Sequence, residues 1–387
     1  MNSLFKFRFF IVSLLLFGLN LSCAQPGNSP LPQGVPPADT PANGVYFIEN
    51  DPVQLENGLA EMEAAPGSAS KIRIVLLGEA LYSYLNDDTE KDAVIFLTYQ
   101  GGGSGTFFYL AVALHENGGF KGKNSIWLGD RIGLPIARVQ NGLITVKYLD
   151  RSYDEPMATA PSLEQTRYFI VDDSGLQEII TAADEAVIQG WLTIGHEVRS
   201  FLPCNKTDEL WLTGNSPALD TIISAHGKSI AGLPPYTPVF AILSGSRIAS
   251  PEAGFGADYK ESFSPSRLIR IWPQGNCRGD FILLDSPLPG AAISSPLKIQ
   301  GQARGTWFFE GDFPVILFNS QAEKIAESYA TAKGEWMTEN FVEFEGIISF
   351  ESSLSGQQGT LILKKDNPTG LAQFDDELKI PVYFNLV

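Results

Sequence analysis

The chain has 387 residues, of which 44% are hydrophobic and 18% are charged, with 37 glycines and 25 prolines. This length and composition suit two or three domains with cores of their own and exclude a disordered or collagen-like polymer. Lys and Arg number 27 against 44 Asp and Glu, and the formal net charge of -17 disfavours nucleic-acid binding because such a field repels phosphate.

Residues 1–22 have the order of a secretory signal peptide. Lys6 and Arg8 precede an apolar run from Phe9 to Phe17, which is too short for a transmembrane helix. No acidic residue lies before Cys23, so loss of the two cations Lys6 and Arg8 changes the net charge from -17 to -19. We therefore predict an exported and strongly acidic mature chain.

Two cleavage sites compete around Cys23. Cleavage before it resembles the processing of bacterial lipoproteins, whose new N-terminal cysteine carries the acyl chains that hold the protein on a membrane. Ser22 fits that pattern and Asn20 departs from it. Cleavage after Ala24 is the alternative and releases a soluble, secreted or periplasmic protein. Residues 23–43 are rich in proline and predict an extended tether, which suits an anchored chain.

Residues 44–181 predict an antiparallel β domain, because apolar runs alternate with Gly, Asn and Asp turns. A glycine-rich loop at 101–105 separates two of the expected strands, and Asn141-Gly142 is a strong hairpin signal. Residues 103–112 and 127–131 resemble a module of exported bacterial proteins of unassigned activity. The expected strands are 72–77, 93–99, 106–115, 136–139 and 143–148, followed by a hairpin over 168–179.

Residues 182–286 predict a small barrel with one helix. Ser216 is the expected N-cap, Pro217 the first helical residue and Gly227 the end of the helix. Strands, one helix and further strands suggest a five-stranded barrel of the OB type. Residues 195–204 and 254–259 resemble motifs of envelope lipoprotein barrels related to the NlpE C-terminal domain. The expected strands are 190–202, 209–213, 239–248, 268–272 and 281–284.

Cys204 and Cys277 are the two cysteines that remain after Cys23. An exported chain leaves the reducing cytoplasm, and both cysteines adjoin turn formers, so we expect a disulfide between them. Two buried free thiols are the alternative.

Residues 287–387 predict a β-sandwich that begins after a proline-rich boundary. Residues 301–310, 334–337 and 359–368 carry motifs that resemble the immunoglobulin-like domain of bacterial spore germination, and the resemblance covers 292–387. It implies a non-enzymatic module of exported proteins that binds other envelope components. The expected strands are 297–304, 307–309, 315–318, 324–332, 342–350, 360–365 and 379–384.

Motifs for catalysis and cofactor binding are incomplete throughout the chain. Ser104 lacks the final Gly of a nucleophile elbow, His196-Glu197 lacks a second His one turn on, and residues 222–229 lack the first Gly of a phosphate loop. We predict no catalytic residue, cofactor or metal ligand. A Ca²⁺ loop over 86–92 stays open as a lesser alternative, because four acidic side chains, Asp87, Asp88, Glu90 and Asp92, lie at short spacing there.

The six tryptophans are expected in β cores, where large aromatic rings pack readily, and not on a sugar-stacking surface. Arg304, close to Trp307 and Glu310, is expected to form a buried structural pair and not a ligand site.

The sequence thus favours a non-catalytic lipoprotein of the bacterial cell envelope. It would present three β-rich modules to an envelope protein or cell-wall component, without nucleic acid, and touch the membrane only through its lipid anchor. The acidic surface favours basic partners and salt-sensitive association. The alternative is a secreted hydrolase with its site in residues 44–286 and a C-terminal targeting sandwich. A Ca²⁺-dependent glycan binder centred on residues 87–92 is a third reading.

Overall fold

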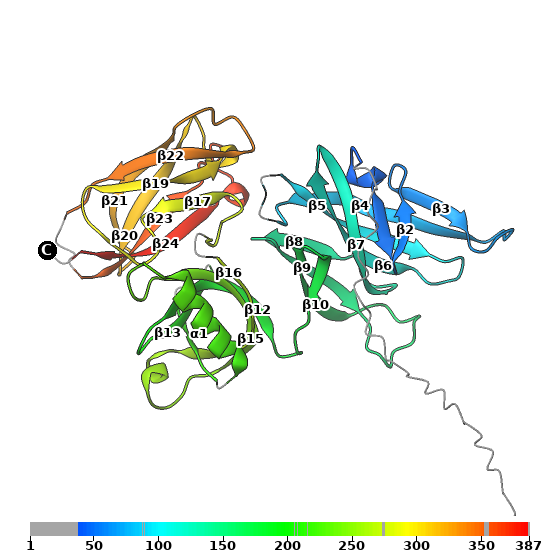
Figure 1. Cartoon of the computed structure of the whole chain (residues 1–387), viewed down its shortest axis with the longest axis horizontal. Helices are drawn as coiled ribbons and strands as arrows, with labels where there is room; N and C mark the ends of the chain where they lie inside the picture. Colours follow the sequence, from blue (N-terminus) through cyan, green and yellow to red (C-terminus); the bar gives the residue numbers. More distant parts are fainter. Residues whose placement is uncertain are drawn as a thin grey trace, which may run out of the picture.

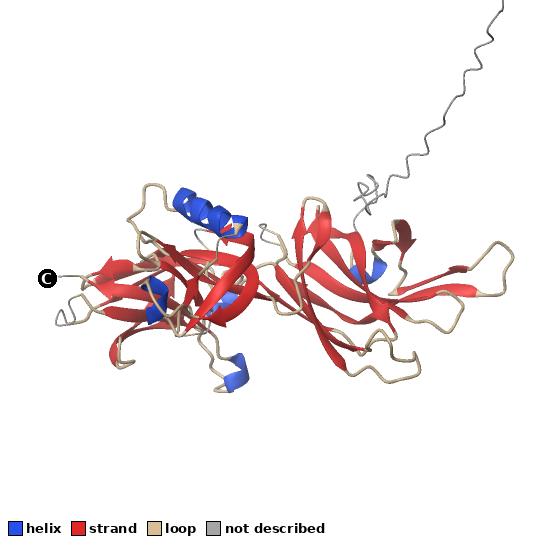
Figure 2. Ribbon diagram, turned by 90° about the horizontal axis from the view of Figure 1, so that it is seen from below, coloured by secondary structure: helices blue, strands red, loops and turns tan. Residues whose placement is uncertain are grey.

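A computed structural model describes residues 38–385 apart from 87, 89, 205, 207, 215, 273–274 and 352–355. The protein is mainly β and has several domains: two N-terminal sheets, a closed barrel and an eight-stranded C-terminal sheet (Figure 1). Figure 2 shows the same strands from below, with the α-helix at the edge of the barrel. The signal segment, Cys23 and residues 24–37 lie outside the described residues.

The N-terminal part consists of a seven-stranded sheet in the order β2-β1-β7-β6-β5-β4-β3 and a four-stranded sheet in the order β11-β10-β9-β8. All pairings are antiparallel except a short parallel contact between β1 and β7. The expected strands and hairpins of residues 72–179 are confirmed. The bounds are β1 (Val45–Ile48), β2 (Asp51–Gln54), β3 (Leu59–Glu63), β4 (Lys71–Ser83), β5 (Asp92–Gln100), β6 (Phe107–Glu116), β7 (Gly119–Asp130), β8 (Ile136–Gln140), β9 (Leu143–Asp150), β10 (Leu163–Asp172) and β11 (Gly175–Ile179).

The seven-stranded sheet is strongly curled. Strands β2 and β3 stand at opposite ends of the sheet order, yet only residues 55–58 connect them. One face packs against the four-stranded sheet through buried side chains such as Phe108, Leu110 and Phe169. The other face encloses its own core around Tyr46 and Leu97. The sheet therefore has a concave side that encloses a core of its own.

Asp92 is fully buried, although it belongs to the acidic run in which a Ca²⁺ loop was considered. Its carboxylate accepts hydrogen bonds from the backbone N–H groups of Leu85, at 3.0 Å, and His115, at 2.9 Å. Asp92 therefore ties two backbone segments together and does not face the loop. Lys91 next to it pairs with Glu339, in the loop before β22 of the C-terminal domain, at 2.7 Å. Asp87 and Thr89 lie outside the described residues.

Burial raises the pKa of Asp92 to about 6, against the opposing effect of its two backbone hydrogen bonds. Because the folded pKa exceeds the unfolded value, Asp92 adds stability that is complete below about pH 4 and is lost as the pH rises through about 6. We expect the stability of the wild type relative to Asp92→Asn to fall by about 1 kcal/mol between pH 5 and pH 7.5. Urea unfolding of both proteins at the two pH values measures this change in relative stability. The exposed Asp154→Asn is the control. An equal difference in stability between the wild type and Asp92→Asn at the two pH values would refute the raised pKa of Asp92.

The middle domain is a closed barrel in the order β12-β13-β14-β16-β15. Strands β14 and β16 pair in parallel, and the other pairs are antiparallel. This strand order confirms the expected OB-type barrel, and along the chain a helix lies between its third and fourth strands, β14 and β15. The strand expected over 190–202 is in fact two strands, because residues 195–198 form the turn between them. The bounds are β12 (Ala186–Ile194), β13 (Arg199–Pro203), β14 (Leu210–Leu212), β15 (Val239–Ala249) and β16 (Glu261–Trp272).

The helix α1 (Pro217–Ser229) begins where the sequence predicts. The Ser216 hydroxyl accepts a hydrogen bond from the backbone N–H of Leu219, and Pro217 takes the first helical position. Its buried face, with Leu219 and Ile222, packs into the barrel core. The helix continues past Gly227, which was expected to end it, and closes at Ile230 instead. Among the described residues, no helix has both the length and the apolar character needed to cross a membrane.

The C-terminal domain packs two layers of strands face to face. Strand β21 joins the layers, because it pairs with β20 over most of its length and with β22 only through residues 330–332. Phe313 and Phe344 meet between the layers at 4.9 Å between ring centroids, almost perpendicular. The bounds are β17 (Ile282–Ser286), β18 (Ala291–Ile293), β19 (Leu297–Arg304), β20 (Asp312–Asn319), β21 (Lys324–Ala332), β22 (Phe341–Ile348), β23 (Gln358–Lys364) and β24 (Glu377–Phe384).

Two strand predictions in this half of the chain were wrong. Strand β17 was expected to close the barrel, but it pairs with β19 in the C-terminal sheet. Residues 307–309 were expected as a strand, but 305–307 form a 3-10 turn that buries Trp307. A side chain at Gly305 would meet the backbone oxygens of Trp336 and Thr338 within 2.1 Å, so the chain can turn there only with glycine.

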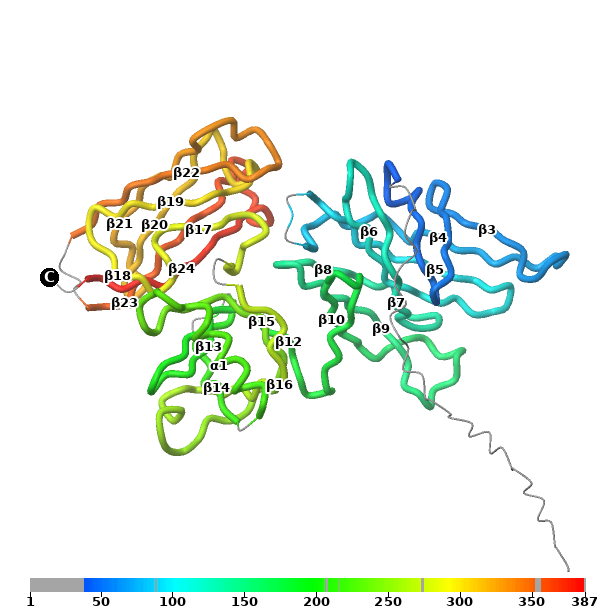
Figure 3. The backbone as a smooth tube through the Cα atoms, viewed as in Figure 1, coloured from blue at the N-terminus to red at the C-terminus, as the bar shows by residue number. Residues whose placement is uncertain are grey.

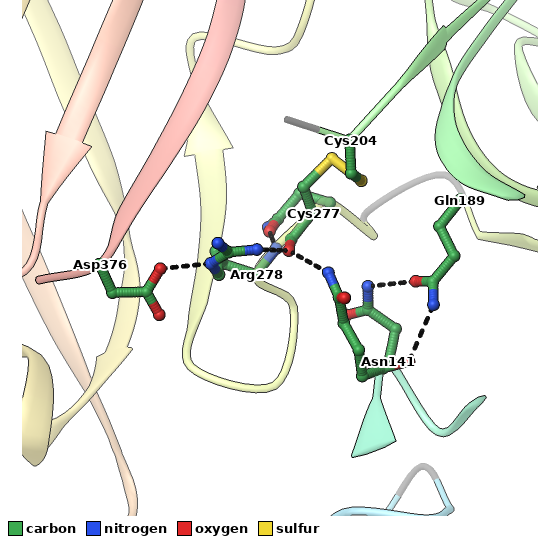
Figure 4. Close-up of a disulfide and its surroundings, with 8 residues drawn as sticks. Asn141, Gln189, Cys204, Cys277, Arg278 and Asp376 are labelled. Carbon is green, nitrogen blue, oxygen red and sulfur yellow. Dashed lines mark hydrogen bonds and ion pairs between the residues drawn. A yellow bond between two sulfur atoms is a disulfide. The ribbon is translucent and has the colours of Figure 1, made fainter. Parts of the chain in front are cut away.

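The Cys204–Cys277 disulfide is confirmed and lies where all three domains meet (Figure 4). The turn between β8 and β9 contacts the region of the disulfide. Gln140 donates a hydrogen bond to the carbonyl of Cys277, and Asn141 donates one to the side chain of Gln189 in the barrel. On the other side, Arg278 forms an ion pair with Asp376 of the C-terminal domain. The segment around Cys277 therefore connects the N-terminal sheets, the barrel and the sandwich.

Candidate functional site

A pocket of about 720 Å³ lies between the barrel and the C-terminal sandwich. Its walls come from the outer face of β12 and β13, from the loops before β15 and β16, and from β18, β23 and β24 of the sandwich. The polar and aromatic side chains that line it are Trp191, Thr193, Ser200, Glu209, Tyr236, Thr237, Tyr259, Gln358 and Tyr383, and the prolines are Pro234, Pro235, Pro238, Pro289 and Pro381.

The alternation of the two barrel strands builds one wall. Leu192 and Phe201 are fully buried in the barrel core, so their neighbours Trp191 and Ser200 point outward to the pocket. Across the strand pair, Trp191 lies opposite Leu202 and Thr193 lies opposite Ser200. These four positions form the part of the pocket wall that the first two barrel strands supply.

The sandwich builds the opposite wall. Strand β18 pairs in parallel with β24, and β23 flanks β24 on its other side, next to the barrel in Figure 3. Val382 is fully buried in the sandwich core, so its neighbours Pro381 and Tyr383 face the pocket. Tyr383 keeps 46% of its surface exposed. Gln358 lies directly opposite it on β23 and adds an amide to the same wall.

Tyr236 lies at the rim of the pocket in a backbone conformation that tyrosine rarely adopts, with φ at 64°. Its ring occupies the space above Gly195, where a Cβ would come within 1.7 Å of it. Gly290 makes a similar close approach, because a Cβ there would meet the Pro238 ring at 2.6 Å. The rim is thus held by two glycines and a strained aromatic residue, a combination that is common at functional sites.

Glu209 is the one acid among the described residues that line the pocket. Burial raises the pKa of its carboxyl group, and a hydrogen bond from Ser200 opposes that shift. The pKa values of Tyr259 and Tyr383 are raised as well, first by burial and then by the charge of Glu209. Tyr383 belongs to the sandwich and Glu209 to the barrel, so the two domains share one electrostatic environment.

The sequence analysis did not predict this pocket, although two sequence motifs that it singled out contribute to the lining. The motifs at 195–204 and 254–259, which resemble envelope lipoprotein barrels, are far apart in the chain and both contribute lining residues, among them Ser200 and Tyr259. No sequence motif marked Glu209 or Tyr383 as a pocket residue, because only the contact between the domains brings them together.

The other sequence candidates do not converge on one site. Ser104 lies in the exposed loop between β5 and β6, and His196 lies in the exposed turn between β12 and β13. Trp191 and Trp307 are buried as expected, whereas Trp127 is 52% exposed. In the part of the chain that the structure describes, no group of three or more His, Cys, Asp or Glu side chains is arranged to hold a metal ion.

Comparison with known families identifies one segment. Residues 281–371 match the family described as the immunoglobulin-like domain of bacterial spore germination. The match agrees with the resemblance seen in the sequence and begins at Phe281, immediately before β17, in accord with the place of that strand in the sandwich. A search of curated proteins found no match to the chain.

Proposed function

We propose that this chain is a non-catalytic lipoprotein of the bacterial cell envelope that binds a cell-wall glycan between its barrel and its sandwich. The observation that carries the proposal is the pocket itself: an aromatic and proline-rich space lined by the turn between β12 and β13 and by the loop before β16, the two loops with which OB-type barrels bind ligands, and closed by an immunoglobulin-like module. The signal segment, Cys23 and the proline-rich tether support export and anchoring.

The chemistry of the lining favours a neutral or weakly polar sugar chain. Tyrosine rings offer flat apolar faces to pyranose rings, while the hydroxyls of Tyr259 and Tyr383 can both donate and accept hydrogen bonds. An oligonucleotide would meet the carboxylate of Glu209 and a chain with a net charge of -17. The barrel face therefore suits glycan better than nucleic acid.

Binding to purified peptidoglycan sacculi tests the proposal. The mature chain should sediment with sacculi, and Tyr383→Ala should weaken this binding about tenfold, because it removes one aromatic wall of the pocket. The matched control is Tyr329→Ala, an exposed tyrosine of the same domain that does not line the pocket. Equal binding by both variants would place recognition elsewhere.

The same chain expressed in cells tests the anchor, since Cys23→Ser should move from the membrane fraction to the soluble fraction.

A secreted hydrolase is the second candidate, and one observation favours it. A glutamic acid whose pKa is raised by burial, as for Glu209, has the property that a general acid needs. Incubation of sacculi with the mature chain separates the two functions. Release of soluble fragments that Glu209→Gln abolishes would replace the binding proposal, and intact sacculi with retained binding would support it.

A further inference from the structure

A second pocket, of about 400 Å³, opens on the concave side of the seven-stranded sheet. It belongs to the N-terminal domain alone and shares no residue with the pocket between barrel and sandwich. Its floor is aliphatic, with residues such as Ile48 and Ile74, and its walls are aromatic and acidic.

Four aromatic side chains form the wall on three adjacent strands. Tyr99 on β5 lies opposite Phe107 on β6, with 6.1 Å between their ring centroids. Tyr109 on β6 lies opposite Trp127 on β7. Phe107 and Tyr109 are two residues apart on one strand, so all four side chains project to the same face. Trp127 is half exposed, an unusual state for the largest apolar side chain, and it lines this pocket.

Two carboxylates complete the rim. Glu49 and Asn50 form the tight turn between β1 and β2, both with positive φ, at 51° and 77°. The turn points Glu49 toward the aromatic wall, where its Oε1 accepts a hydrogen bond from the Tyr109 hydroxyl at 3.1 Å. Asp51 follows directly and also lines the pocket. Burial and the charge of Glu49 raise the pKa of Tyr109, so the tyrosine stays neutral and keeps donating to the carboxylate.

The aromatic wall and the two carboxylates together determine which ligand charge the pocket favours. Among the described lining residues, two are acidic and none is basic, so an anion would be repelled. A neutral sugar would gain no charge–charge attraction from the two carboxylates, and the Tyr109 hydroxyl is already engaged by Glu49. A cation, in contrast, gains from the negative faces of the rings and from both carboxylates, and an aliphatic stem would match the floor.

We propose that this pocket binds a small organic cation, an alkylated ammonium group whose head lies against Trp127, Tyr109 and Glu49. The site is independent of the proposed glycan pocket, and it gives the acidic chain a specific place for cationic ligands.

Choline is the probe that tests the proposal, and 3,3-dimethylbutan-1-ol is its neutral counterpart of the same shape. We expect calorimetry with the mature chain to detect choline binding, and the neutral alcohol to bind at least tenfold more weakly, because it lacks the charge. Trp127→Ala and Glu49→Gln should each weaken choline binding about tenfold. Equal affinity for the two probes, or no binding of choline, would overturn the proposal.

Matched variants separate a lost site from a damaged fold. Glu79→Gln makes the same charge change at an exposed position of the same domain, and Tyr153→Ala removes a fully exposed ring. Neither lines the pocket, and both should bind choline like the wild type. Loss of affinity in these controls would assign the effect to overall charge or stability and refute the site. Sacculus binding should be unchanged in Trp127→Ala, which keeps this test distinct from that of the glycan pocket.

Discussion

Replacing both Cys204 and Cys277 by serine is expected to destabilise the protein by roughly 4 kcal/mol, the chain-entropy value for a crosslink that closes a loop of this length. The sequence separation of 73 residues means that the unfolded chain loses many conformations when the bond is present. Few single features of a protein contribute this much to a total stability of about 5–15 kcal/mol.

Urea unfolding of the double variant in a background without Cys23 measures this effect, because that background removes the only other cysteine of the chain. Adding a reductant to the unsubstituted pair should reproduce the loss, whereas it should leave the double variant unchanged. A difference below about 1 kcal/mol would contradict the prediction, and it would mean that native-state strain or residual structure in the unfolded chain offsets the entropy of the crosslink.

Replacing Arg304 by alanine is expected to cost about 3 kcal/mol, the second largest effect, because it removes a buried cation on which two domains converge. Arg304 is 4% exposed. Its guanidinium donates to the carbonyl oxygens of Asp280, at 2.9 Å, and Glu339, at 3.0 Å. Arg304 was expected to form a buried structural pair in the sandwich, and it is buried, but it pairs with backbone carbonyls and rings instead of with Glu310.

The rings explain why this arginine joins domains. The guanidinium carbon lies 3.3 Å from the ring centroid of Tyr84 in the N-terminal domain and 4.3 Å from that of Phe341 in the sandwich. A planar guanidinium can stack between two rings and donate at its edges at the same time, and an ammonium cannot. Arg304→Lys should therefore lose about half as much stability as Arg304→Ala.

Thermal unfolding measures both variants, with Arg267→Ala as an exposed control that should change stability by less than about 0.5 kcal/mol. We also expect the alanine variant to unfold in two steps, since the N-terminal domain loses one of its links to the sandwich. A single cooperative transition with the full loss of stability would show that Arg304 acts within the sandwich alone.

The sequence allowed local structure to be predicted well. The strands over 297–304 and 324–332 have the predicted bounds, because alternating apolar residues and turn formers mark both ends. The Asn141-Gly142 turn was predicted for the same reason, with positive φ at both residues. What could not be predicted is where such an element docks. Nothing in residues 136–148 indicates that the tip of this hairpin enters the disulfide region of another domain.

The misplaced strand and the two missed pockets have one physical cause, which is contact between segments far apart in the chain. Residues 281–284 read as a strand, and they are one, but periodicity does not tell which sheet a strand joins. The same holds for the two pockets. Trp127 was expected in a core because strands usually bury such rings, and its exposure appears only once β6 and β7 are placed. Glu209 and Tyr383 become neighbours only through the contact between domains.

The disulfide also has a mechanical consequence if the chain is anchored at its N-terminus, as proposed above. If the N-terminus is held and a partner pulls on the sandwich, tension passes from Cys204 to Cys277 through the sulfur atoms and bypasses the residues between them. The backbone of the helix α1 and of strands β14, β15 and β16 then lies outside the covalent path of the tension. At about 3.5 Å per extended residue, the bond withholds about 250 Å of chain from extension. The barrel wall formed by these strands is thus shielded from tension between the tether and the sandwich.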